Sequence, residues 1–151
     1  MPALLIERLA EAEEELAAAC SLAAARVPEA EEPLAELEAR HVEAAAELRV
    51  QAARRGQDPR SAARRLQTAW ARAWSRLRVG TATWATASGA LEWLRDRELR
   101  LARRYAALLS AENLDVEVRE RVRASVAAAW QRTIAVERLV ALQEFGELAS
   151  A

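Results

Sequence analysis

The chain of 151 residues is 52% hydrophobic and 30% charged, with a formal net charge of −1. This length suits a single core, so we expect residues 1–151 to form one domain. Aromatic residues make up only 5% of the chain, and Ala, Leu, Glu and Arg supply most of the rest. These are strong helix formers, and the composition predicts an all-α protein. No window approaches eighteen apolar residues and the first residues do not resemble a signal peptide, so we expect a cytoplasmic protein without a membrane span.

Chemistry-bearing residues are few. Cys20 is the only cysteine and His41 the only histidine. The single cysteine excludes an internal disulfide, and its alanine neighbours predict a buried thiol. The sequence also lacks a Gly-rich phosphate loop, a nucleophile elbow and a cysteine pair. These features disfavour an ordinary hydrolase or transferase, and we assign no catalytic residue.

The first two helices are predicted from about residue 3 to 26 and from Pro33 to Gly56, because apolar residues recur every three or four positions. Pro28 ends the first helix, and the Glu-rich turn over 27–33 reverses the chain. The expected inward stripes are Leu5, Leu9, Ala12, Leu16, Cys20 and Ala23, then Leu34, Leu37, His41, Ala44, Leu48 and Ala52.

The connection to the third long helix begins at Asp58 and Pro59, an N-cap followed by proline, and predicts an extra helix. Trp70 and Trp74 lie on its inward stripe, so we interpret them as core residues. Its other side is basic and is a candidate surface for an anionic partner, made of Arg60, Arg64, Arg65, Arg72 and Arg76. Because the tryptophans face inward and the arginines outward, we expect a solvated basic face and no nucleic-acid partner.

The third and fourth long helices follow. We expect a frayed or broken start over Thr86–Gly89, then a helix in which Glu98 occupies a core position. Asp115 is predicted to cap the last helix, which reaches about Leu148 and is roughly 50 Å long. Its expected inward face consists of Val122, Val126, Ala129, Thr133, Val136 and Val140.

The lengths of the connections indicate how these helices are arranged. Short turns join the first helix to the second and the third to the fourth, whereas about 30 residues join the second to the third. A connection of that length can carry the chain back along a bundle. The prediction is therefore an up-down-down-up four-helix bundle of the ferritin-like kind, with an extra helix in the long connection.

A set of residues occurs in an order that is typical of one bacterial family. The set is Leu5-Ile6-Glu7, Glu13, Ala46-Glu47-Leu48, Gly56-Gln57-Asp58-Pro59, Trp70, Glu98 and Tyr105. Over most of residues 4–142 the chain resembles the ferritin-like proteins catalogued as "domain of unknown function 2383". This resemblance implies the same bundle and raises the question of a metal centre.

Ferritin-like relatives that bind two irons use a Glu from each of two helices and a Glu-x-x-His motif from each of the other two. Residue by residue, the resemblance implies Glu13, Glu38, His41 and Glu98 as metal ligands. One histidine and up to three carboxylates are too few for a di-iron cage, although they suit a single Fe, Mn or Zn ion.

Two positions depart from the family pattern. The fourth long helix has Val136 and Glu137 where the family tends to have a histidine followed by an acid. In the third long helix, Arg95 replaces an acid. A protein-only network in which His41 pairs with Glu98 is therefore favoured over a metal ion, and we expect no cofactor.

The charges are segregated along the chain. Residues 1–47 contain twelve Glu and three Arg, whereas residues 48–104 contain fourteen Arg and four acidic residues. Such a split can pair helices within one molecule or pair two copies, and the last helix adds apolar residues for a partner, namely Trp130, Val140, Leu142 and Phe145. We expect a homo-oligomer, with a dimer favoured.

Three functions remain open at this point. The favoured one is a ferritin-like structural or interaction module that has lost its metal centre and self-associates. The second is a metal-binding stress or storage protein, which as an enzyme would be a metal-dependent oxidoreductase. The third is a protein that binds an anionic surface through the arginines of the connection.

Overall fold

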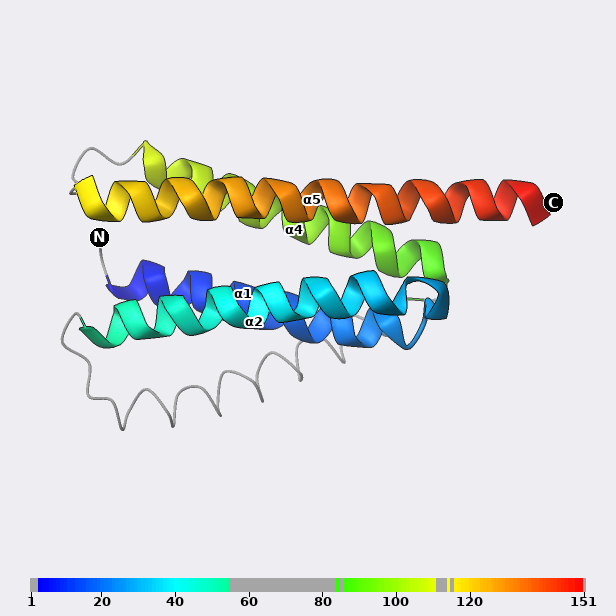
Figure 1. Cartoon of the computed structure of the whole chain (residues 1–151), viewed down its shortest axis with the longest axis horizontal. Coiled ribbons are helices and arrows are strands. Elements are labelled where there is room, and N and C mark those ends of the chain that lie inside the picture. Colours follow the sequence, from blue (N-terminus) through cyan, green and yellow to red (C-terminus); the bar gives the residue numbers. More distant parts are fainter. Residues whose placement is uncertain (1–2, 55–83, 85, 111–113, 115, 151) are drawn as a thin grey trace. The chain divides into compact units, whose positions relative to one another are not determined.

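Figure 1 shows the computed structural model of the chain, which describes residues 3–54, 84, 86–110, 114 and 116–150. The described residues form four α-helices and one short 3₁₀ turn, and no strand occurs among them. The elements in order are α1 (Ala3–Ala24), η1 (Pro28–Ala30), α2 (Glu31–Arg54), α4 (Ala87–Leu109) and α5 (Val116–Ser150). The all-α prediction is thus confirmed for this part of the chain.

The turn between α1 and α2 is made by the residues that the sequence indicated. The N–H groups of Arg26 and Val27 both donate to the carbonyl oxygen of Ala23 at 2.9 Å, which closes the end of α1. Pro28 opens η1, where its fixed backbone angle and missing N–H are tolerated. Val27 is buried, so the turn that reverses the chain is also anchored in the core.

Helices α1 and α2 pack against each other along their length as a hairpin (Figure 1). The predicted stripes are largely confirmed, because Leu9, Leu16, Leu34 and Leu37 are buried. Cys20 is also fully buried, as its alanine neighbours predicted. Two acidic residues of α1 and two basic ones of α2 share this interior, and these are Glu13, Glu14, His41 and Arg49.

The start of α4 is capped, so the prediction of a frayed or broken start is wrong. Thr86 has extended backbone angles and its Oγ1 accepts a hydrogen bond from the N–H of Gly89 at 3.0 Å. This satisfies one of the N–H groups that every helix start leaves without a partner in the helix. Trp84 packs edge-on against Trp93, with ring centroids 5.3 Å apart, and steadies the chain before the cap.

Helices α4 and α5 form the second hairpin (Figure 1). Five of the six residues predicted to face inward on α5 are buried: Val122, Ala129, Thr133, Val136 and Val140. At 35 residues α5 is about 52 Å long, whereas the 23 residues of α4 span about 35 Å. The C-terminal part of α5 therefore extends past the start of α4 (Figure 1).

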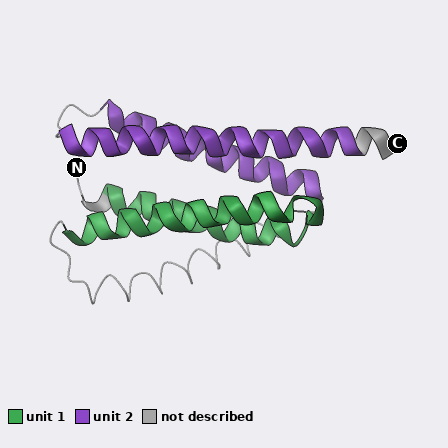
Figure 2. Cartoon of the chain, viewed as in Figure 1, with its two compact units in different colours: residues 1–83 green, residues 84–151 purple. Residues whose placement is uncertain are grey.

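The contacts within the chain define two compact units, residues 1–83 and residues 84–151 (Figure 2). Each unit contains one of the hairpins. The single domain and the up-down-down-up order stay predictions. The extra helix predicted after Asp58 and the cap predicted at Asp115 lie outside the described residues.

None of the described helices contains a run of residues that is long and apolar enough to cross a membrane.

Candidate functional site

A buried carboxylate and imidazole meet between α1 and α2. Glu13 Oε2 lies 2.5 Å from His41 Nδ1, and both side chains are fully shielded from solvent. A polar pair at this depth is stable only because each group replaces lost water with a hydrogen-bond partner. The fold therefore brings Glu13 and His41 together, and the partner that His41 finds in its own hairpin is Glu13.

A second buried pair adjoins the first on α1. Arg49 Nε donates to Glu14 Oε1 at 3.0 Å and Arg49 Nη2 donates to Glu14 Oε2 at 2.9 Å. The planar guanidinium fits the carboxylate with two parallel hydrogen bonds, which is the strongest geometry for such a pair. The sequence analysis gave Arg49 no partner, because apolar spacing along one helix does not show which charges meet across a hairpin.

The second hairpin also buries an acid beside a cation. Glu98 Oε2 on α4 lies 3.6 Å from Arg132 Nε on α5, with the two side chains 0% and 4% exposed. This distance is an ion-pair contact and is too long for a good hydrogen bond. Glu98 thus occupies the core position that was predicted, and a cation of its own hairpin accompanies it.

Arg95, at a position where the resemblance led us to expect an acid, contacts an acid of α5. Arg95 Nε on α4 lies 3.8 Å from Glu137 Oε1 on α5, at the partly exposed edge of the hairpin. Arg95 also contacts its neighbour Asp96 at 3.3 Å. The arginine that replaces an expected acid is therefore part of a charge pairing between the two helices.

Helices α1 and α4 carry the same buried pattern, displaced by 85 positions from Glu13 to Glu98. The matching buried pairs are Ile6 and Leu91, Leu9 and Leu94, Glu13 and Glu98, Leu16 and Leu101, Ala17 and Ala102, Cys20 and Tyr105, and Ala23 and Leu108. Both helices therefore bury a glutamate at the matching position of an apolar stripe, and α1 also buries Glu14 beside it. The repeat is visible in the sequence, and it was a usable signal for both glutamates.

The predicted metal ligands are only partly brought together. Glu13 and His41 touch, Glu38 is half-buried on α2, and Glu98 belongs to the other compact unit. Within the described ranges no three His, Cys, Asp or Glu side chains are grouped so that they could hold a metal ion. The candidate anion-binding residues Arg60, Arg64, Arg65, Arg72 and Arg76 lie outside those ranges.

The buried groups do not fit a metal ion as they are arranged. Two ligands that each lie ~2.1 Å from a tetrahedral metal are themselves about 3.4 Å apart. Glu13 Oε2 and His41 Nδ1 are only 2.5 Å apart and are occupied with each other. Beside Glu98, the guanidinium of Arg132 supplies a positive charge at the place where a cation would have to bind.

No known protein family, curated protein or solved structure matches this chain.

Proposed function

We propose that this protein is a non-catalytic helical scaffold that works by self-association, built on a ferritin-like bundle whose acidic core positions hold ion pairs. The observation that carries the proposal is that buried glutamates of both hairpins face a basic side chain of the same hairpin. Glu13 meets His41, Glu14 meets Arg49 and Glu98 meets Arg132. Carboxylates used in this way hold helices together and have less capacity to bind a metal.

The pairs suit a scaffold because they penalise wrong helix pairings. Removing water from two charges costs several kcal/mol, which their attraction recovers only in good geometry. A shifted α1–α2 hairpin would leave Glu14 buried without Arg49, and a shifted α4–α5 hairpin would separate Glu98 from Arg132. We infer that these pairs select one alignment of each hairpin, as single buried polar residues do in coiled coils.

The ferritin-like arrangement is part of this proposal and rests on two supports. One is the resemblance carried by residues such as Glu13, Glu98 and Tyr105. The other is the repeated buried pattern of α1 and α4, which is what two related hairpins in one bundle would show. Solution scattering of the full chain tests it, because a compact bundle has a radius of gyration of about 15 Å at this length, and two hairpins lying apart would give a larger value.

The metal-binding alternative is kept because Glu13 and His41 are ligand types that the fold does bring together. The test is metal analysis of protein purified without added metal or chelator. We expect wild type, His41→Ala and the exposed control Arg40→Ala to contain equally little Fe, Mn and Zn. Near-stoichiometric metal that disappears in His41→Ala and persists in Arg40→Ala would overturn the scaffold proposal.

A second experiment, with two substitutions in one protein, also distinguishes the scaffold from the metal-binding alternative. The double variant Glu13→Leu/His41→Leu removes both members of the buried pair together, so neither is left without the other. A scaffold should keep its helix content by circular dichroism and its association state. A metal protein should instead lose any increase in melting temperature that added Mn²⁺ or Zn²⁺ produces in wild type.

A further inference from the structure

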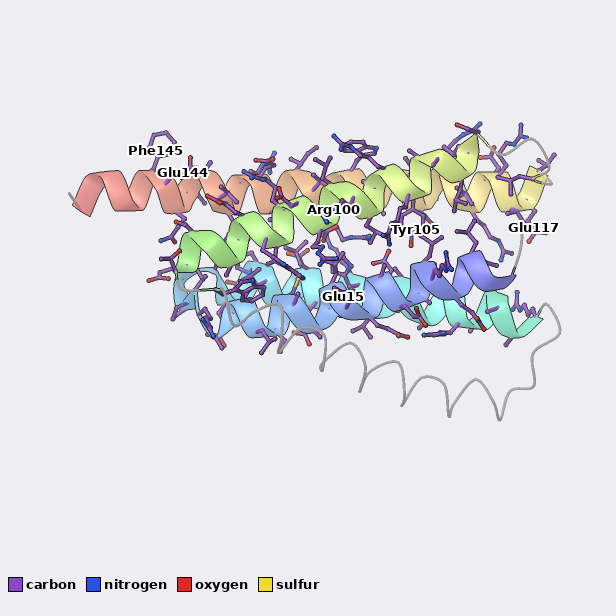
Figure 3. All side chains as sticks on the ribbon, turned by 180° about the vertical axis from the view of Figure 1, so that it is seen from behind. Glu15, Arg100, Tyr105, Glu117, Glu144 and Phe145 are labelled. Atoms are coloured by element: carbon purple, nitrogen blue, oxygen red, sulfur yellow. The ribbon has the colours of Figure 1, made fainter. Side chains whose placement is uncertain are left out.

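Helix α5 carries most of the exposed large hydrophobic side chains that the structure describes. Five of the seven exposed large hydrophobic side chains in the described ranges belong to this helix. Their exposed fractions are 80% for Val116, 40% for Trp130, 51% for Ile134, 68% for Leu142 and 71% for Phe145. Phe145 visibly points away from the ribbon (Figure 3). Exposed apolar residues gathered on one element indicate a contact surface.

These five residues share one side of the helix. At about 100° per residue, they fall within a sector of about 120°. The buried residues of α5, including Val122, Ala129 and Val136, are centred on roughly the opposite side. Helix α5 therefore has two apolar faces, one packed against α4 and one facing outward. We name the outward one the outer face of α5.

Two opposite charges, with Arg123 beside the first of them, lie within the outer face. Glu120 is in its N-terminal half and Arg138 in its C-terminal half, and both are exposed. Glu120 contacts Arg123 on the helix surface at 2.6 Å, an exposed pair that exchanges easily with another partner. A partner that covers this face must offer a cation near Glu120 and an acid near Arg138. A second copy of α5 running in the opposite direction offers both.

We infer that a second copy of this chain docks on the outer face of α5 with the two helices antiparallel and the two-fold axis near residue 129. In this register Val116 lies level with the partner's Leu142, and Glu120 lies level with the partner's Arg138. Ala124 then lies level with the partner's Ile134. Each contact occurs twice because a two-fold interface repeats every pair. This inference rests on the proposed function, because it assigns the proposed self-association to one surface.

The residues at the centre suit a close approach of the helices. Ala124 and Ala127 are exposed on the outer face, and their small side chains leave room for Ile134 and Trp130 of the partner. Helices that pack through such residues approach to about 8–10 Å between axes. A parallel dimer would instead set Arg138 beside the partner's Arg138 and Glu120 beside the partner's Glu120, which is repulsive.

The experiment is sedimentation equilibrium of the full chain over a range of concentrations, with circular dichroism to show that each variant is folded. All substituted side chains are exposed, so folding should not change. Ile134→Asp should abolish dimerisation. Glu120→Arg and Arg138→Glu should each weaken it about tenfold, since two attractive pairs become repulsive. The double variant Glu120→Arg/Arg138→Glu should restore the wild-type dissociation constant, as should mixing the two single variants.

Phe145 supplies the matched control. It belongs to the outer face but lies beyond the overlap with the partner's α5, so Phe145→Ser should change the dissociation constant by less than Ile134→Ser. Dimers that are unaffected by Ile134→Asp and by both charge reversals would overturn the inference and leave the scaffold proposal intact. A chain that stays monomeric at all concentrations would overturn both the inference and the proposed self-association.

Discussion

The two hairpins begin with the same buried pattern and end differently. In the first, α1 and α2 have 22 and 24 residues, and two pairs of an acidic and a basic side chain are buried, with contacts of 2.5 to 3.0 Å. In the second, α4 has 23 residues, α5 has 35, and the buried pair is 3.6 Å apart. Helices of similar length cover each other, and their hydrogen-bonded buried pairs favour one alignment of the two helices. In the second hairpin, α5 also carries exposed apolar residues on the side away from its buried stripe.

The largest expected effect comes from breaking the best pair of the first hairpin. Arg49→Leu leaves the Glu14 carboxylate buried without a cation, and we expect the free energy of unfolding to fall by about 3–5 kcal/mol. Urea unfolding followed by circular dichroism measures this loss. The double variant Glu14→Leu/Arg49→Leu should regain most of it, because no buried charge remains unpaired. Equal losses in the single and double variants would contradict the role given to this pair.

The second prediction compares the hairpins directly through double-mutant cycles. The coupling energy between Glu14 and Arg49 should exceed that between Glu98 and Arg132 by about 1–2 kcal/mol, since only the first pair makes two charge-assisted hydrogen bonds. Leucine substitutions at each residue, singly and together, supply the four proteins of each cycle. A larger coupling in the second hairpin would reverse the comparison.

The smallest expected effect concerns the cap of α4. Thr86→Ala removes the hydrogen bond to Gly89 and should lower the free energy of unfolding by about 1 kcal/mol. Thr86→Ser keeps the hydroxyl and should retain most of the stability. As a reference for surface effects, Arg40→Ala removes an exposed pair with Glu36 on α2 and should change stability by less than about 0.5 kcal/mol. A loss at Thr86 no larger than this reference would argue against the cap.

Much of the fold could be predicted because helix signals are local. The inward stripes of α1, α2 and α5 follow from apolar spacing, and the turn at Pro28 follows from proline chemistry. The expectation of a frayed or broken start over Thr86–Gly89 was wrong, because the cap depends on one side-chain hydrogen bond that apolar spacing does not show. The residue that caps the helix is Thr86, three positions before Gly89. The N–H of Gly89 reaches the Thr86 hydroxyl, and glycine has no side chain to crowd that oxygen.

The candidate site was predictable only in part. The buried positions of His41 and Glu98 follow from helical periodicity, which places both in an apolar stripe, whereas Glu13 was named only through the family resemblance. The residues that pair with these buried acids do not follow from periodicity, because a long arginine side chain can reach inward or outward from similar positions on a helix. Arg49 and Arg132 were therefore missed, although they determine what the glutamates do.

The sequence by itself determined that the described segments are helical, that the chain turns at Pro28 and which apolar residues of α1, α2 and α5 face inward, since these depend on local spacing and proline chemistry. Only the tertiary structure decided that Glu13 meets His41, that Glu14 meets Arg49 and that Glu98 has Arg132 beside it. It also decided that the outer face of α5 stays exposed. The physical reason is that charge pairing and exposure depend on the alignment of two packed helices, and periodicity within one helix does not specify that alignment.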